Sequence, residues 1–304
     1  MSILTKNPAV GIISFIIILF SMALGHTGMI MMETIFGKEH INMAAVILGI
    51  IGLLLLVYGI VTVSKTKATI LGLFGGIFIW TGWIEFAFVY YANRYHIAPL
   101  TVVKEVIDEN GVSQMIEEVV TKPEYLLMPS SVGLWAVYMI FYFFGSKTGC
   151  TFFTWFQSKM KLHKKHEFVA TKRNTALSTF MEVIILMWTF YLLLLFAYDA
   201  NFFGDRHWVT YFIAFGSLFW TLFLVRKLWK IKSMDYAIKY ALPTVIIFWN
   251  FIEIMGRWDF FKEFWIEPEV YWLEMSLIFV VFIIFIVSAL LISNSKKKKK
   301  KIQV

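Results

Sequence analysis

Residues 243 to 272, PTVIIFWNFIEIMGRWDFFKEFWIEPEVYW, join an apolar helical run to a loop rich in aromatic and charged side chains. Asn250, Glu253 and Arg257 follow the spacing i, i+3 and i+7, which places them on one face of a helix. An ionisable group at membrane depth costs a few kcal/mol unless it is paired or hydrated, so it marks a functional site by default. The alternative is an internal clasp, in which Glu253 and Arg257 neutralise each other and join two helices.

The whole chain has the composition of a membrane protein. Hydrophobic residues make up 59% of its 304 residues and charged residues 16%, whereas water-soluble domains carry about a quarter charged residues. Apolar runs near the ~20 residues that cross the hydrocarbon core occur at about 9–32, 41–63, 69–92, 129–145, 175–198, 208–225, 236–255 and 270–292. The sequence therefore predicts an all-α, polytopic membrane helix bundle of about eight transmembrane helices, with one transmembrane domain over 1–292 and a lysine-rich cytoplasmic tail over 293–304.

The distribution of basic residues predicts the orientation of this bundle. Lys and Arg concentrate in cytoplasmic loops, and placing both termini in the cytoplasm puts 21 of the 28 Lys and Arg residues on that side. The charge surplus is then explained by the lipid bilayer as partner, without nucleic acid. The largest cytoplasmic loop is 146–173, where TFFTWFQSKMKLHKKH has the pattern of an interfacial helix. The largest outer loop is 93–128, in which the apolar and acidic pattern predicts one or two short surface helices interrupted at Gly111.

Candidate site residues gather toward the predicted outer side. His26 lies in the outer third of the first span, and Glu85 lies about two turns inside the third span, where a carboxylate needs a partner from another helix. The connection YDANFFGDRHW carries Asp199, Asp205 and His207. Carboxylates and imidazole suit divalent metals. The alternative for this connection is a local pairing of Asp, Arg and His within the turn.

These positions predict two sets of site residues. Glu85, Glu253 and Arg257 are the catalytic candidates, and the metal candidates are Asp199, Asp205, His207, Glu253 and His26. Cys150 is the only cysteine, so the chain has no disulfide framework and no cysteine metal cluster.

From about residue 172 onward the chain resembles the C subunit of the copper-containing membrane monooxygenases that oxidise methane, ammonia or short alkanes. GRWDFFKEFWIEPEVYW carries most of the similarity, with KRN at 172–174 and the turn from Asp199 to His207 in comparable order. The resemblance implies a membrane oxidoreductase, or a subunit of one, with a divalent metal such as copper as cofactor. The chain departs from the family at the metal site, where the family's asparagine falls near Glu253 and its two histidines fall near Arg257 and Val270. A second family cluster, one Asp and two His, is represented at most by Asp199 or Asp205 with His207.

Two other functions remain open. The same carboxylates could serve a transporter or channel for a cation or small polar solute, with Pro243 as a hinge. The chain could also be a noncatalytic assembly subunit that binds other membrane subunits. Bound metal would favour the oxidoreductase, and substrate-driven ion flux would favour the transporter.

Overall fold

The structure is a computed structural model that describes residues 8–107, 113–144, 151–161 and 174–302. Seven helical segments of the described residues are long and apolar enough to cross a membrane, so the predicted all-α membrane bundle is confirmed. Helix α1 supplies two of these segments, because it bends at Gly37, whose φ of 60° and ψ of 179° are not helical. The seven segments are Ala9–Gly37 and Glu39–Val61 of α1 (Ala9–Val61), Lys65–Arg94, α7 (Thr175–Tyr198), α8 (Trp208–Leu228), α9 (Met234–Arg257) and Trp272–Ser295 of α10 (Trp272–Ile302).

The third span contains a change of helix type. It begins as α2 (Lys65–Ile79), continues as the π-helix η2 (Trp80–Glu85) and ends as α3 (Phe86–Arg94). The backbone N–H of Phe86 donates to the carbonyl of Thr81, five residues earlier, as a π turn requires. Such wide turns are rare and frequently occur at functional sites. Here Glu85 is the last residue of the π-helix.

The fourth predicted span, 129–145, differs from the prediction. Its described part consists of the short helix η3 (Met128–Ser131), preceded by α4 (Pro123–Leu127), and the 13-residue helix α5 (Val132–Phe144). At 1.5 Å per residue, α5 is about 20 Å long, which is shorter than the ~30 Å hydrocarbon core. It packs antiparallel to α7, where the indole of Trp135 donates to Thr189 at 3.1 Å and that of Trp188 donates to Ser131 at 3.0 Å.

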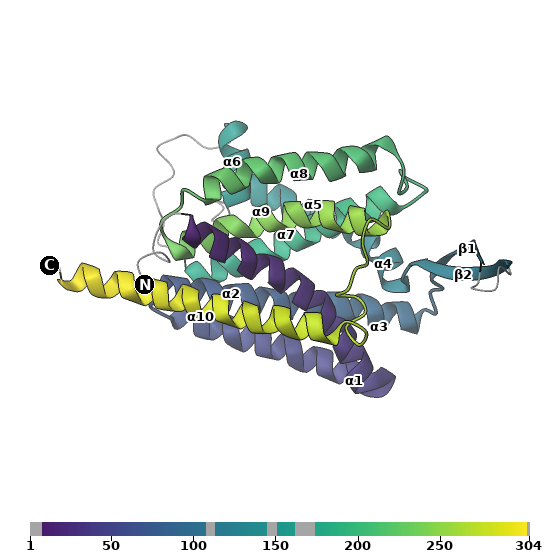
Figure 1. Ribbon diagram of the computed structural model, residues 1–304, viewed down its shortest axis with the longest axis horizontal. Coiled ribbons are helices and arrows are strands. Elements are labelled where there is room, and N and C mark those ends of the chain that lie inside the picture. Colours follow the sequence, from purple (N-terminus) through teal and green to yellow (C-terminus); the bar gives the residue numbers. More distant parts are fainter. Residues whose placement is uncertain (1–7, 108–112, 145–150, 162–173, 303–304) are drawn as a thin grey trace.

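The predicted surface helices of the outer loop are wrong. Strands β1 (Leu100–Ile107) and β2 (Ser113–Thr121) form an antiparallel hairpin instead. The reason is local composition, because TVVKEVI is rich in β-branched residues, which favour extended backbone over helix. Figure 1 shows this hairpin projecting from the bundle.

The basic connection at the other end is helical in part, because α6 covers Thr151–Lys159. This helix falls within the predicted interfacial segment, whereas His163, Lys164 and Lys165 lie outside the described residues. Residues 293–302, predicted as a tail, continue α10 as a helix.

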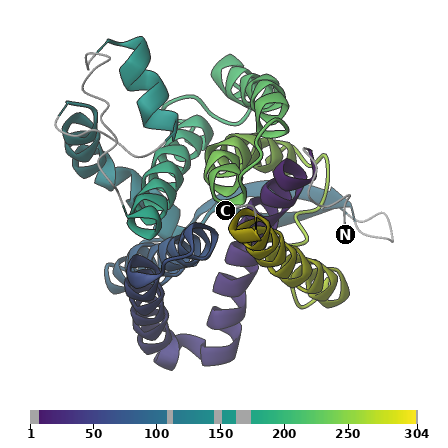
Figure 2. The same cartoon turned by 90° about the vertical axis from the view of Figure 1, so that its left-hand side faces the viewer.

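Successive long helices run in opposite directions. In Figure 1, α1 begins and α10 ends at the end of the bundle opposite the hairpin. This arrangement agrees with the predicted alternation of loops, and the assignment of that end to the cytoplasm stays a prediction. Figure 2 looks toward the end where α10 finishes and shows the two arms of α1 diverging at the edge of the bundle.

Close backbone contact holds α2 between α1 and α7. A methyl group at Gly76 would place its carbon 2.8 Å from Cβ of Val183 in α7, and one at Gly72 would overlap the backbone carbonyl oxygen of Ala176. Small residues at four-residue spacing allow this approach in lipid. The tight packing positions the π turn of the third span against α7, which carries Tyr191.

Candidate functional site

The core of the site is a contact between α1 and α9. His26 Nε2 lies 3.6 Å from Oε1 of Glu253, and both side chains are mostly buried, with 17% and 21% of their surfaces exposed. The indole of Trp249 donates to the same Glu253 oxygen at 2.6 Å. Trp249 also stacks on the His26 ring, at 6.0 Å between centroids and 15° between planes. The imidazole and the carboxylate are thus held together inside the protein.

The second carboxylate, Glu85, is connected to His26 through Tyr191. Tyr191 of α7 donates its hydroxyl to Oε1 of Glu85 at 3.4 Å, and its ring stacks on His26 at 6.4 Å. A cavity of about 20 Å³ is lined by Ser21, Met22, Gly25, His26, Ile77, Thr81, Glu85, Met187 and Tyr191. A buried water needs ~10–15 Å³ and two to four polar partners. The cavity therefore accommodates about one water between His26 and Glu85.

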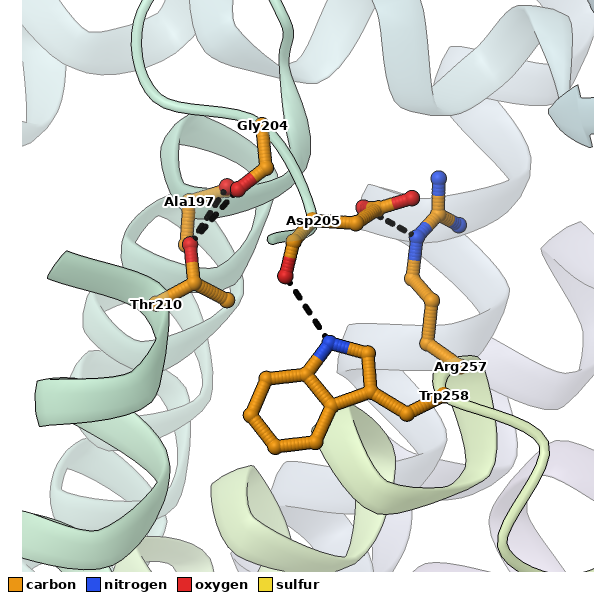
Figure 3. A network of polar contacts seen from close by, with 6 residues as sticks. All are labelled: Ala197, Gly204, Asp205, Thr210, Arg257 and Trp258. Carbon is orange, nitrogen blue, oxygen red and sulfur yellow. Dashed lines mark hydrogen bonds and ion pairs between the residues drawn. The ribbon is translucent and has the colours of Figure 1, made fainter. Parts of the chain in front are cut away.

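Arg257 contacts a carboxylate other than the one that the helical spacing predicts. Its Nε donates to Oδ1 of Asp205 at 2.7 Å, as Figure 3 shows. The indole of the next residue, Trp258, donates to the backbone carbonyl of Asp205 at 2.8 Å. The guanidinium of Arg257 also lies 4.5 Å from the ring of Tyr198. Arg257 therefore fastens the end of α9 to the turn that follows α7, and Glu253 instead contacts His26 and Trp249.

The turn itself is closed from within by Thr210 of α8. This fully buried hydroxyl contacts the carbonyls of Ala197 at 3.1 Å and Gly204 at 2.7 Å (Figure 3). Gly204 has a φ of 90°, in the region that favours glycine. The turn thus has a fixed shape that presents Asp205 to Arg257.

Asp199 and His207 act as helix-end residues. The Oδ1 atom of Asp199 accepts from the backbone N–H of Asn201 at 2.8 Å, just after α7. The Nδ1 atom of His207 accepts from the backbone N–H of Val209 at 3.3 Å and so caps the N-terminus of α8. A cap of this kind satisfies one of the free N–H groups of the first turn.

The predicted metal ligands are not gathered into one site. Among the residues that the structure describes, no three His, Cys, Asp or Glu side chains come together as a possible metal site. His26 and Glu253 form a pair, Asp205 contacts Arg257, and Asp199 and His207 cap separate helix ends. Copper and zinc sites use three or four ligands. The described residues therefore do not fit the copper cofactor that the family resemblance implies.

A further carboxylate, Glu263, comes from the loop between α9 and α10. A methyl group at Gly256 would place its carbon 2.7 Å from Cδ of Glu263, so the carboxyl group lies directly against the last turn of α9. Burial raises the pKa of Glu263 to about 7. This value includes smaller effects of neighbouring charges, because Glu253 and Asp259 raise the pKa and Arg257 lowers it.

Three residues of the site were not among the predicted ones. Trp249 precedes Glu253 by four positions, and this i, i+4 spacing on one helix face could have indicated their contact. Tyr191 and Glu263 carry no comparable signal, because each reaches the site from a different part of the chain.

Comparisons with protein families, with curated proteins and with solved structures found no match to this chain. The resemblance to monooxygenase C subunits therefore stays a prediction. The helices themselves define the class, an integral membrane protein with several spans.

Proposed function

We propose that this protein transports protons across the membrane and that His26, Glu85 and Glu253 bind the transported proton. The observation that carries the proposal is the contact of His26 with Glu253, beside a water-sized cavity that leads to Glu85. Chains of Asp, Glu and His inside membranes are typical of proton relays in pumps and transporters. The three groups come from α1, η2 and α9, so a small movement of these helices would change the distances between them.

A second group of polar side chains lies nearer the end of the bundle where α10 ends. Lys239 of α9 donates to the hydroxyl of Ser178 in α7, one turn from the fully buried Glu182. Lys239 and Asn250 lie on one face of α9, about 16 Å apart along its axis, and Glu253 follows one turn later. Between Lys239 and Asn250, however, this face of α9 carries the core residues Leu242 and Ile246, so the contact of Lys239 with Ser178 is separate from the outer site.

The oxidoreductase function rests on the sequence resemblance, and the separation of the candidate ligands argues against its copper site. Stoichiometric metal in protein purified without chelator, lost in the His26→Ala and Glu253→Ala variants, would favour the oxidoreductase over the transporter. Binding of other membrane subunits is compatible with either function.

Proton flux into reconstituted vesicles tests the proposal. A potassium diffusion potential would drive protons inward, and an enclosed pH-sensitive dye would report their arrival. We expect Glu253→Gln and Glu85→Gln to slow the flux by roughly 10²-fold, the lower end of what a positioned acid or base contributes. Glu274→Gln is the matched control, because Glu274 is an exposed carboxylate at the start of α10. Wild-type flux no faster than in empty vesicles would refute proton transport.

A further inference from the structure

The loop from Trp258 to Tyr271 is fixed beside the His26 and Glu253 pair. The indole of Trp265 is 4% exposed and lies 5.1 Å from the ring of Trp249, the residue that donates to Glu253. The hydroxyl of Thr27, next to His26 in α1, donates to the carbonyl of Trp265 at 3.0 Å. The loop is therefore anchored to both helices that supply the pair.

Glu263 is the acidic side chain that this anchored loop turns toward α9. Its Cδ and Cγ atoms lie 2.7 Å and 2.8 Å from the position that a methyl carbon at Gly256 would take. Gly256 follows Glu253 by three residues, or about one turn of α9, so the Glu263 carboxyl group lies against the turn that follows Glu253. Glu263 is only partly buried, which leaves its carboxyl group in reach of water.

We propose that Glu263 takes up protons from the adjacent aqueous phase and passes them to Glu253, an inference that rests on the proposed proton transport. The Glu263 carboxylate accepts a proton from hydronium, which forms a carboxylic O–H bond and leaves a water molecule. That O–H bond then breaks as the proton moves to the Glu253 carboxylate, and Glu263 returns to its anionic form. The step needs no further reactant.

The surroundings of Glu263 suit a group that exchanges protons near neutral pH. The titratable and charged groups that act on it are Glu253 and Arg257 of α9 and Asp259 of its own loop, and its charge also acts on Tyr198 of α7. Because its pKa is raised to about 7, both the protonated and the ionised forms are populated at that pH. A carboxyl group at its ordinary pKa would be almost fully ionised there.

Two variants separate the proton chemistry of Glu263 from its position. Glu263→Gln removes the exchangeable proton and keeps the shape of the side chain. Gly256→Ala keeps the carboxyl group but moves it away, because the added methyl group would overlap it. Gly216→Ala is the control, since a methyl group at this glycine of α8 meets no atom within 4 Å.

The proton-flux assay in vesicles compares the rate of each variant with that of the wild type. We expect Glu263→Gln to slow the flux by at least about tenfold, below the full contribution of a positioned acid or base, and Gly256→Ala to slow it in the same direction. Gly216→Ala should keep the wild-type rate. Only Glu263→Gln should also remove the midpoint near pH 7 from the dependence of the rate on pH.

An infrared titration of the wild-type protein and Glu263→Gln provides a measurement that does not depend on flux. The carboxylic C=O absorbance that titrates near pH 7 should be smaller in the variant than in the wild type by the contribution of one carboxyl group, and equal absorbance in the two proteins would overturn the relay. Wild-type flux that both Glu263→Gln and Gly256→Ala preserve would also overturn the relay while leaving proton transport intact. Absence of flux in the wild type would refute the proposed function and the relay together.

Discussion

Replacing Thr210 with Val should destabilise the turn that presents Asp205 to Arg257. Thr210 is fully buried, and its hydroxyl contacts two backbone carbonyls, at 2.7 Å and 3.1 Å. Valine has nearly the same shape but no hydroxyl, so both carbonyls would lose this donor. Each intramolecular hydrogen bond contributes about 1 kcal/mol, and a buried group left without its partner costs ~1–3 kcal/mol. We therefore expect a loss of about 1–3 kcal/mol in the free energy of unfolding.

The matched control is Thr221→Val in the same helix, α8. Thr221 is 3% exposed, and its hydroxyl has no hydrogen-bond partner among the described residues. The change of side chain is identical, so the difference in helix propensity between Thr and Val cancels. Removing a buried hydroxyl that lacks a partner is expected to be neutral or stabilising, because its cost of desolvation is removed.

Unfolding in mixed detergent micelles, followed by loss of helical circular dichroism, measures both variants against the wild type. Thr210→Val should be less stable than Thr221→Val by at least about 1 kcal/mol. Equal losses in the two variants would refute the assignment of the Thr210 hydroxyl as the element that closes the turn.

Three further experiments test the site and the topology. Gly25→Ala and Gly28→Ala each add a methyl group where no atom lies within 4 Å, so both should gain up to about 1 kcal/mol of helix stability. Only Gly25 lines the cavity, so only Gly25→Ala should slow the proton flux. Equal proton flux in the two variants would contradict a water in the proton route. The pKa of Glu263 rises from 4.5 to about 7 in the fold, so its ionisation destabilises the protein increasingly between these pH values and fully above them. Glu263→Gln should therefore gain roughly 1–2 kcal/mol in unfolding free energy at pH 8, after allowance for solvent screening. At pH 4 the variant should have the same unfolding free energy as the wild type. An equal gain at both pH values would show that Glu263 does not titrate between them. Reporter fusions at Met115 and Met160 should report opposite sides of the membrane, and a report from one side would overturn the topology.

Much of the fold was predictable because membrane spans depend on short stretches of sequence. A run of about 20 apolar residues must form its backbone hydrogen bonds internally, and a helix does this within the run itself. The segments around α7, α8 and α9 were predicted within a few residues for this reason. The third span was also found, but its π turn at Glu85 was not, since hydropathy is the same in either helix type. The hairpin of the outer loop was not predicted, because its acidic and apolar pattern fits short surface helices, whereas its β-branched residues favour extended backbone.

The sequence by itself determined that polar groups accumulate at one end of the bundle, including His26, Glu85 and Glu253. Only the tertiary structure decided which of them meet, because partners on different helices depend on how those helices rotate and pack. Spacing within one helix favoured Glu253 with Arg257, whereas packing between helices brought Glu253 to His26 and a turn 52 residues away brought Asp205 to Arg257. Glu263 joined the site for the same reason, since its loop is held by Thr27 of the first helix. Local sequence fixes the faces and depths of side chains, and long-range packing selects their partners.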